Sequence, residues 1–380
     1  MRVLCSTTPM EGVFAPVVPI AQALAGQGHS VLVATASDLA ERVRSTGLAV
    51  TIAGPAAPDA AARAVRDPEF AAGRQPWRIG AVMFARIMAP EKLPALQRIA
   101  ADFQPDLILH PSVDLAAPLL AESLGIPSVT YGTGLPLEPE LIAAMAGWVA
   151  PLWEANGLTP DANAGLYRHG YLDPLPLPLA AGFPPTRILP VRPTPPGSVD
   201  DPLPLWAYRL GSRPVVYVSL GTVPIFNRPE FFAPILTGLA DLDVDVIVTV
   251  GADTDPAALG DVPSNVHIEQ WLSLPALLMR CDAVVCHGGA GTTLAALAQG
   301  LPLVLLPRGA DQFPTAAACA RAGAAEVLTP DAITADAVRG AVQLVLKEES
   351  YRTAAGRIRA EIEAMPSPAS VVADLEALIS

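Results

Sequence analysis

Positive charge is scarce in this sequence. Its 380 residues include 24 lysines and arginines against 37 aspartates and glutamates, which gives a formal net charge of −13. A chain this acidic lacks the electrostatic attraction that binds nucleic acids or anionic membranes, so we expect neither as a partner. If the protein binds a phosphate group, local backbone N–H donors have to hold it, because the overall charge repels anions.

Cysteine is also rare. The four cysteines include no CxxC pair, and three lie in apolar runs, which indicates buried, reduced thiols in a cytoplasmic protein. The N-terminal residues MRVLCSTTP lack the apolar core of a signal peptide. No apolar stretch reaches the length of a transmembrane helix without glycine, proline or charge. We therefore expect a cytoplasmic protein without stable membrane insertion.

Two common nucleotide-binding signatures are missing. No GK[ST] follows a glycine loop, as it would in a P-loop enzyme, and no GxGxxG follows the first predicted strand. The second absence disfavours an NAD-dependent dehydrogenase. No cluster of histidine, aspartate and glutamate has the spacing of metal ligands, so the sequence predicts neither a metal nor a bound cofactor.

Apolar residues make up 51% of the chain, enough for more than one buried core at this length. Near the N-terminus, short apolar runs at 3–5, 31–34 and 50–52 alternate with helical patterns at 17–25 and 37–46. This β-α-β-α-β order predicts a doubly wound parallel sheet. The alternation continues with helices at 93–103 and 115–124 and with strands at 106–109 and 128–130.

Residues 174–213 are dense in proline. Proline interrupts helices and sheet ladders, so we interpret this stretch as a linker along the surface between two domains. We predict α/β domains at 1–200 and 205–365. The expected strands of the second are 215–220, 244–250, 266–268, 283–286 and 303–306, and its expected helices are 231–239, 274–279, 293–299, 314–322 and 333–347.

Residues 366–380 end the chain with a predicted helix. Its apolar face consists of Val371, Val372, Leu375, Leu378 and Ile379. Because an apolar face has to be buried, we expect this helix to pack back on the first domain.

A glycine-rich loop lies in the second predicted domain. Residues 287–293 read HGGAGTT and come between the strand at 283–286 and a helix. Glycines let backbone N–H groups approach a ligand closely, and the following helix presents its positive end. The pattern indicates a site for a phosphate or diphosphate. A tight glycine turn without a ligand is the alternative interpretation.

Two further loops favour the ligand site. SLGT at 219–222 ends the first strand of this domain, and PRGADQF at 307–313 ends the strand after the glycine helix. In a parallel sheet such loops emerge at the same edge, where ligands bind. Asp311 and Gln312 offer a carboxylate and an amide there, which suit the hydroxyl groups of a sugar.

The motifs VSLGT (218–222), NVHIEQWLSLPALL (265–278), HGGAGTT (287–293) and GADQF (309–313), in this order, resemble those of family 1 nucleotide-sugar glycosyltransferases. The chain looks most like the actinobacterial enzymes that attach deoxysugars to polyketides, and the resemblance runs over its whole length. It implies the GT-B fold: an acceptor-binding and a nucleotide-sugar-binding Rossmann-like domain that face a cleft, with a C-terminal helix returning to the first domain.

The resemblance also implies roles for individual residues. The diphosphate would lie between the glycine loop and loop 219–222, the base against Trp271 and the backbone of Leu272, and the sugar against Asp311 and Gln312. Simple packing is the alternative for Trp271. The implied nucleotide-sugar contacts are Ser219, Gly221, Thr222, Trp271, Leu272, His287, Gly288, Gly289, Ala290, Gly291, Thr292, Asp311 and Gln312.

The implied reaction moves a deoxysugar by direct displacement, with inversion at the anomeric carbon. Backbone N–H groups would stabilise the departing diphosphate without a metal, and a base would remove the acceptor's proton. In plant relatives a glutamate grips both ribose hydroxyls, and Ala295 stands at the matching position here. Because a glutamate would be left partly unpaired by a deoxyribose, its absence favours a dTDP-sugar over a UDP-sugar as co-substrate.

The usual base of the family is absent. Most relatives carry a histidine after the first strand, where this chain has Val13, and Pro111 replaces the aspartate that supports it in plant members. Three explanations remain open: a substitute base among His110, Asp114 and Glu138, an acceptor acidic enough to ionise, or attack from carbon. Each side chain also has a structural interpretation: Asp114 as a helix cap, Glu138 as a solvated residue and His110 as a packed one.

The first domain's loops are apolar and aromatic, which predicts a flat, apolar acceptor of polyketide type, although such residues also fill cores. The acceptor contacts we expect are Val13, Phe14, Met83 and Trp148. Two other functions stay open: a sugar-nucleotide epimerase of the same fold, and a non-catalytic glycosyltransferase-like partner that activates a sister enzyme. The sequence leaves both a monomer and a homodimer open.

Overall fold

The computed structural model describes residues 1–73, 76–180, 187–223, 225–251 and 254–379. The chain forms two compact units. The first contains Met1–Pro174, residues 187–192 and the C-terminal residues from Pro366 on. The second contains Leu175–Ala180 and Pro193–Met365.

The described part of the first unit contains a parallel sheet of seven strands in the order β3-β2-β1-β4-β5-β6-β7. The chain winds outward from β1 to β3 and then continues from β4 in the other direction, which is the predicted doubly wound arrangement. The predicted strands overlap β1 to β5. The strands are β1 (Arg2–Ser6), β2 (Ser30–Thr35), β3 (Ala49–Ile52), β4 (Leu107–Pro111), β5 (Ser128–Tyr131), β6 (Tyr171–Asp173) and β7 (Ile188–Pro190).

Successive residues of β1 belong to two separate cores, because side chains alternate across a strand. Val3 and Cys5 pack with α2 (Val18–Gly26), and Leu4 packs with α7 (Ala89–Phe103) and α8 (Ala116–Leu124). The sequence analysis missed the helices between 57 and 88 and the helix α9. The remaining helices are α1 (Glu11–Phe14), η1 (Ala15–Val17), η2 (Ser37–Leu39), α3 (Ala40–Ser45), α4 (Ala57–Ala64), α5 (Pro68–Gly73), α6 (Pro76–Val82), the π-helix η3 (Met83–Met88) and α9 (Pro139–Ala155).

The second unit has a parallel sheet of six strands in its described part, in the order β10-β9-β8-β11-β12-β13. The predicted strands correspond to β8 to β12, and α10 and α14 pack against one face of the sheet. The strands are β8 (Val215–Ser219), β9 (Asp245–Thr249), β10 (Val266–Glu269), β11 (Ala283–Cys286), β12 (Leu303–Leu305) and β13 (Ala325–Val327). The helices are α10 (Pro229–Leu239), η6 (Pro256–Leu259), α11 (Leu274–Leu278), α12 (Ala290–Ala298), α13 (Gln312–Arg321), η7 (Pro330–Ala332), α14 (Ala335–Lys347) and α15 (Glu349–Ala364).

Part of the proline-rich stretch forms regular secondary structure, which we did not expect of a linker. Its residues Ile188–Pro190 form β7, which pairs with β6 at the edge of the first sheet. An edge strand needs ladder partners on one side only, so it tolerates proline, and the expectation that no ladder forms here was wrong. Before β7, η4 (Leu177–Leu179) belongs to the second unit. After β7, η5 (Leu205–Arg209) also belongs to it, and there Trp206 stacks on the His267 ring at a centroid distance of 4.3 Å.

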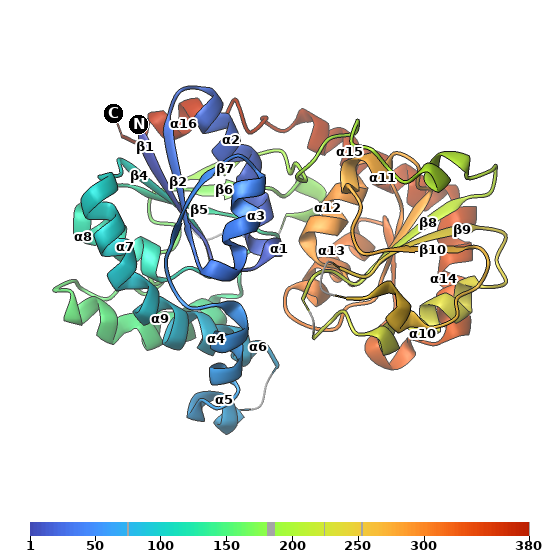
Figure 1. The fold of residues 1–380 in the computed structure, drawn as a ribbon, viewed down its shortest axis with the longest axis horizontal. Helices are drawn as coiled ribbons and strands as arrows, with labels where there is room; N and C mark the ends of the chain where they lie inside the picture. Colours follow the sequence, from blue (N-terminus) through green and yellow to red (C-terminus); the bar gives the residue numbers. More distant parts are fainter. Residues whose placement is uncertain (74–75, 181–186, 224, 252–253, 380) are drawn as a thin grey trace. The chain divides into compact units, whose positions relative to one another are not determined.

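The C-terminal segment packs with the first unit's own residues. Val371, Val372 and Leu375 are buried in the same core as α2, and α16 (Val372–Glu376) lies beside α2 in Figure 1. The amide of Gln27 donates a hydrogen bond to the carbonyl of Ala369. Both chain ends therefore belong to this unit (Figure 1).

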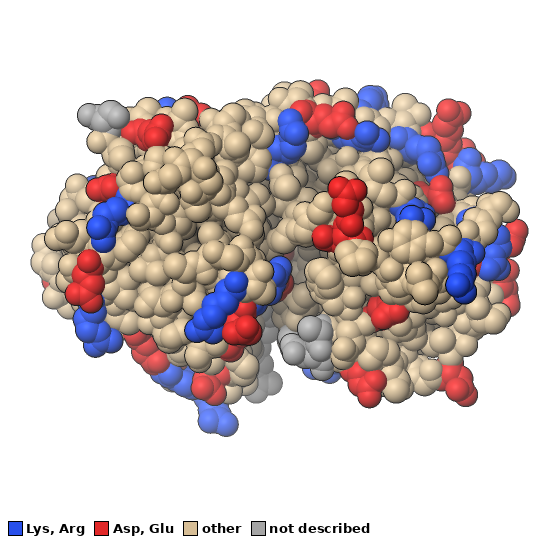
Figure 2. Space-filling view, turned by 45° about the horizontal axis from the view of Figure 1, so that its top comes forward, with Lys and Arg blue, Asp and Glu red and all other residues tan. Residues whose placement is uncertain are grey.

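The charged side chains are scattered. On the face shown in Figure 2, basic and acidic residues alternate and leave broad uncharged areas between them. In the part of the chain that the structure describes, we find no helix long and apolar enough to span a bilayer.

Candidate functional site

Three loops meet at one edge of the second sheet. They follow β8, β11 and β12, which are neighbours in the strand order. Cys286 at the end of β11 pairs with Ser219 on one side and with Leu305 on the other. The sequence expectation that SLGT, HGGAGTT and GADQF share the carboxyl edge of the sheet is therefore confirmed for the strands that carry them.

The His287 ring lies between two glycines of these loops. A Cβ atom added at Gly221 would lie 2.6 Å from its Nε2 and Cε1 atoms, and one added at Gly289 would also lie within 3.0 Å of the ring. Gly221 and Gly288 have positive φ angles of 84° and 85°, which other residues rarely adopt. A side chain at residue 221 or 289 would collide with the imidazole, so glycine is needed at both positions to leave room for it.

His287 is held in its uncharged form. Burial lowers its pKa to about 4, and the nearby carbonyl of Ser219 offsets only part of this shift. Its Nδ1 atom is buried and has no partner among the residues that the structure describes. Near pH 7 the side chain therefore has a single N–H donor and brings no positive charge.

The start of α12 supplies further donors. Gly289 precedes the helix in an extended conformation, and its carbonyl accepts a bond from Thr293 N–H. The N–H groups of Ala290, Gly291 and Thr292 have no acceptor within the helix, because the first turn lacks one. These N–H groups lie at the N-terminal, positive end of a nine-residue helix that begins three residues after His287. This arrangement suits a diphosphate.

The loop after β12 contains the two residues expected to bind the sugar. The Oε1 atom of Gln312 accepts bonds from the N–H groups of Arg308 (2.8 Å) and Gly309 (3.1 Å), so it holds the loop together. Only the amide NH2 of Gln312 is left for a ligand. Burial raises the pKa of Asp311, which directly precedes α13.

Trp271 and Leu272 differ in exposure. Trp271 is 60% exposed and lies outside the core, while Leu272 is buried. Ser219 is buried, and its hydroxyl accepts a weak bond from Gly221 N–H at 3.4 Å. Thr222 is exposed. The second unit thus has an exposed aromatic residue, Trp271, in addition to its N–H donors.

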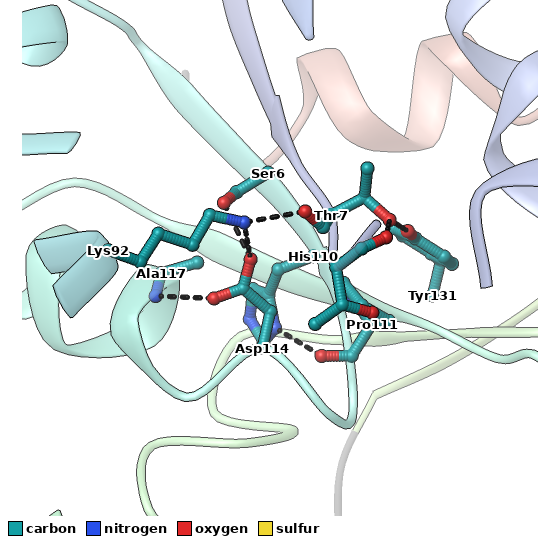
Figure 3. A network of polar contacts seen from close by, with 9 residues as sticks. Ser6, Thr7, Lys92, His110, Pro111, Asp114, Ala117 and Tyr131 are labelled. Atoms are coloured by element: carbon teal, nitrogen blue, oxygen red, sulfur yellow. Dashed lines mark hydrogen bonds and ion pairs between the residues drawn. The ribbon is translucent and has the colours of Figure 1, made fainter. Parts of the chain in front are cut away.

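A buried ion pair lies at the carboxyl edge of the first sheet (Figure 3). Lys92 Nζ lies 2.6 Å from Asp114 Oδ2 and donates a second bond of 2.6 Å to the carbonyl of Thr7. Ser6 Oγ donates to the same Oδ2 atom, and Ala117 N–H donates to Oδ1 at 3.3 Å. Asp114 is therefore surrounded by donors, and its interpretation as a helix cap is confirmed by the Ala117 bond.

Burial acts against both charges of this pair, and each partner opposes that effect on the other. Burial alone would raise the pKa of Asp114, but the charge and hydrogen bond of Lys92 outweigh it, and that pKa lies below its usual value. Burial lowers the pKa of Lys92, and Asp114 opposes this shift. The sequence analysis missed Lys92. The spacing along the helix could have identified it: Lys92 lies four and eight positions before Leu96 and Ala100, so it falls on the buried face of the helix.

The same edge of the sheet contains a small cavity with a volume of about 10 Å³, room for about one water molecule. Its apolar walls come from the π-helix η3, the ends of β1 and β3, and the loop after β4, and Lys92 and Asp114 are its only ionisable lining residues among those described. It is lined by Thr8, Pro9, Ala53, Gly54, Pro55, Phe84, Met88, Ala89, Lys92, Val113, Asp114 and Leu115.

Comparison with known proteins identifies the family. Residues 22–148 and 233–378 match the N-terminal and C-terminal domain models of "Erythromycin biosynthesis protein CIII-like" proteins. The chain is 31% identical to the elloramycin glycosyltransferase ElmGT of Streptomyces olivaceus (99% of this chain, 97% of that protein). It is 30% identical to the tylactone mycaminosyltransferase of Streptomyces fradiae (100% and 92%). The chain belongs to the erythromycin CIII-like glycosyltransferases.

Solved structures agree with this assignment. The spinosyn rhamnosyltransferase SpnG superimposes with a TM-score of 0.84 at 28% identity, covering 99% of this chain and 100% of that one. The glycosyltransferase VinC, in complex with dTDP, gives a TM-score of 0.81 at 27% identity, covering 100% and 99%. The two parallel-sheet units of this CIII-like glycosyltransferase thus have the GT-B fold predicted from its motifs.

Two of the three base candidates in this glycosyltransferase are buried. His110 lies within β4 rather than beyond it, its side chain has no exposed surface, and burial lowers its pKa to about 4. Its Nδ1 is 3.1 Å from the carbonyl of Pro111. Asp114 is closed off by the contacts described above. Glu138 directly precedes α9, is exposed, and does not cap that helix.

The expected acceptor residues of the glycosyltransferase are dispersed. Met83 and Trp148 pack in one cluster with Met88, which also lines the small cavity. Phe14 is fully buried in the core around α2 and offers no surface to a ligand, while Val13 beside it is half-buried. No group of three or more potential metal ligands occurs among the described residues.

Proposed function

We propose that this glycosyltransferase transfers a deoxysugar from a dTDP-sugar to an apolar acceptor of polyketide type, with inversion and without a metal. The observation that carries the donor half is the His287 ring seated between Gly221 and Gly289 beside the free N–H groups of α12. Two similar proteins have been solved with a nucleotide: VinC in complex with dTDP, and SpnG with thymidine diphosphate. Related proteins are named as transferases of mycaminose and daunosamine.

The donor would be held chiefly by neutral groups. We propose that the α12 N–H groups and the uncharged His287 bind the diphosphate, that Trp271 stacks on the base, and that Asp311 with the amide of Gln312 binds the sugar. As the anomeric bond breaks, negative charge grows on the departing diphosphate. Donors already aimed at it stabilise that charge without rearrangement.

The acceptor would bind to the first unit, whose cluster of Met83, Met88 and Trp148 is apolar and aromatic. SpnG has also been solved with its spinosyn aglycone. The protein alone, given a dTDP-deoxysugar and an aromatic polyketide, should release dTDP and form a glycoside. Failure to release dTDP would instead favour the non-catalytic partner, and conversion of the sugar without acceptor would favour the epimerase.

The nucleotide preference can be measured directly. With Ala295 in α12 in place of an acidic residue, no carboxylate is available at this position to pair with a ribose 2′-hydroxyl. We expect dTDP to bind about tenfold more tightly than UDP in titration calorimetry, with ADP as the weak-binding control. Equal or tighter binding of UDP would contradict the dTDP assignment.

Glu138 is the base we propose, because of the three candidates it alone is exposed. Glu138→Gln should lower kcat by about 10²- to 10⁴-fold while the dissociation constant for dTDP stays unchanged. Glu140→Gln, two residues along the same exposed turn, is the matched control and should keep its rate. If Glu138→Gln also keeps its rate, the acceptor ionises without this base, and the rate should then rise with pH through the acceptor's own pKa.

A further inference from the structure

Residues 197–206 of the proline-rich stretch make side-chain contacts with β10 and with the loop that follows it. This loop contains Trp271 and Leu272, the residues assigned to the nucleotide base under the proposed function. Both segments belong to the second unit. The proline-rich stretch therefore touches the proposed nucleotide site.

The first contact joins Asp201 to Ser273. The Ser273 hydroxyl donates a 2.6 Å hydrogen bond to Asp201 Oδ2, and the N–H of Ser198 donates to the same oxygen at 2.8 Å. These two bonds lower the pKa of Asp201, so its carboxylate is charged near pH 7. A Cβ atom at Gly197 would lie 2.8 Å from Asp201 Oδ2 and 2.9 Å from Ser273 Oγ, so only glycine lets the two segments come this close.

Ser273 is used differently from most serines at its position. It occupies the N-cap position of α11, where a serine hydroxyl ordinarily accepts a bond from the first turn of the helix. Within the described residues its side chain makes no such bond. The residue is buried, and its hydroxyl donates to Asp201 instead. The residue directly after Leu272 is therefore tied to the proline-rich stretch.

The second contact is made by Trp206 in η5. Its ring stacks on the imidazole of His267 with a centroid distance of 4.3 Å and an interplanar angle of 5°. Its indole N–H donates a 3.0 Å hydrogen bond to Glu269 Oε1. His267 and Glu269 lie on the same face of β10, because side chains alternate along a strand. Trp206 thus holds the end of β10, two positions before Trp271.

The residues on both sides of Trp271 are held in place, while Trp271 itself is 60% exposed. Besides the contacts with Trp206 and Asp201, the carbonyl of Gln270 accepts a 2.9 Å bond from the N–H of Gly251 after β9. A mobile loop would have to become ordered when the base binds, and that cost would reduce affinity. A loop that is fixed beforehand avoids this cost.

We propose that Asp201 and Trp206 are positioning residues for the nucleotide base and act through the loop that contains Trp271 and Leu272. The proposal rests on the proposed function, because it takes this loop to meet the base of the donor. It gives the proline-rich stretch a part in binding the base and none in binding the diphosphate, since His287 and α12 follow a different strand. Inorganic pyrophosphate and dTDP can therefore test the two parts separately.

The test measures dissociation constants of dTDP and inorganic pyrophosphate for the full chain by titration calorimetry. Asp201→Ala removes the acceptor of the Ser273 bond. It should weaken dTDP binding about five- to tenfold and leave pyrophosphate binding within about twofold of the wild-type value. Asp201→Asn keeps an oxygen that can accept from Ser273, so it should recover most of the dTDP affinity.

Asp200→Ala is the matched control. It removes the neighbouring exposed carboxylate with the same change in net charge, and it should bind both probes like the wild-type protein. Trp206→Phe keeps an aromatic ring for His267 but loses the bond to Glu269. It should weaken dTDP binding and spare pyrophosphate, as Asp201→Ala does.

A second readout needs no nucleotide. In the full chain labelled with fluorotryptophan, the fluorine resonance of Trp271 is assigned by its loss in Trp271→Phe. Without ligand, this resonance should shift in Asp201→Ala and in Trp206→Phe, because the loop is no longer held. It should stay in place in Asp200→Ala.

Two results would overturn the proposal. One is unchanged dTDP affinity with an unmoved Trp271 resonance in Asp201→Ala and Trp206→Phe. The other is an equal loss of dTDP and pyrophosphate affinity, which would mean that these residues stabilise the whole unit. Failure of the proposed function has a different signature: the wild-type protein would then bind dTDP no more tightly than pyrophosphate, and the Trp271 resonance would still decide whether the loop is held.

Discussion

Lys92→Met should lower the free energy of unfolding by about 3–5 kcal/mol, one of the two largest effects expected for this glycosyltransferase. The substitution leaves the Asp114 carboxylate buried without its cation. Among the described residues, Ser6 Oγ and the Ala117 N–H remain as its hydrogen-bond donors. Asp114→Asn should cost a similar amount, because it leaves the buried Lys92 ammonium group without an opposite charge beside it.

The double variant separates the pair from its surroundings. In Lys92→Met/Asp114→Asn neither charge remains, and the asparagine carbonyl can still accept the bond from Ala117 N–H. We expect it to be more stable than either single variant, since replacing both partners removes the uncompensated charge. Urea unfolding at pH 7, followed by circular dichroism, measures all three variants.

An exposed pair in the same unit provides the control. Arg168 and Glu122 form an ion pair whose side chains remain 41% and 32% exposed. Arg168→Met should change stability by no more than about 1 kcal/mol, because solvent screens such pairs. If Lys92→Met lowers the free energy of unfolding no more than Arg168→Met does, the buried pair does not stabilise the edge of the first sheet.

Gly289→Ala should weaken dTDP binding by about tenfold to a hundredfold. The added methyl group would collide with the His287 ring, and the ring cannot retreat towards Gly221, where the space is equally narrow. The imidazole has to leave its seat, and the diphosphate then loses a donor together with the shape of the loop. His287→Ala should by itself weaken binding by a similar factor, without unfolding the protein.

The two substitutions should not be additive. In His287→Ala the ring is gone, so a methyl group at residue 289 meets no obstacle from it, and His287→Ala/Gly289→Ala should bind dTDP almost as well as His287→Ala. Calorimetry on the four proteins gives the coupling. Gly340→Ala in α14, where a Cβ atom meets nothing within 4 Å, should bind like the wild type. If the losses of dTDP binding free energy in the two single variants add up in the double variant, Gly289 is not required to position the His287 ring.

The sequence predicted the strands well where apolar runs were short and separated by glycine turns, as in β1, β2 and β11. It failed at β7, because pairing at a sheet edge depends on a neighbour that the local sequence does not name. It also ended β4 too early: Pro111 pairs with Tyr131, so His110 falls inside the sheet rather than in a loop. This position inside the sheet makes His110 a fully buried residue rather than an accessible candidate base.

The donor loop was within reach of sequence reasoning because its chemistry is local. His287, the glycines and the start of α12 follow one another without interruption, and the strand order of a parallel sheet brings in the loop at Ser219. What only the tertiary structure decided is the state of the buried polar groups. Asp114 gains its partners from Lys92, 22 residues away, and from Ser6, 108 residues away. No local pattern encodes such contacts, since burial and pairing arise only when distant segments pack together, and they turned a candidate base into half of an ion pair.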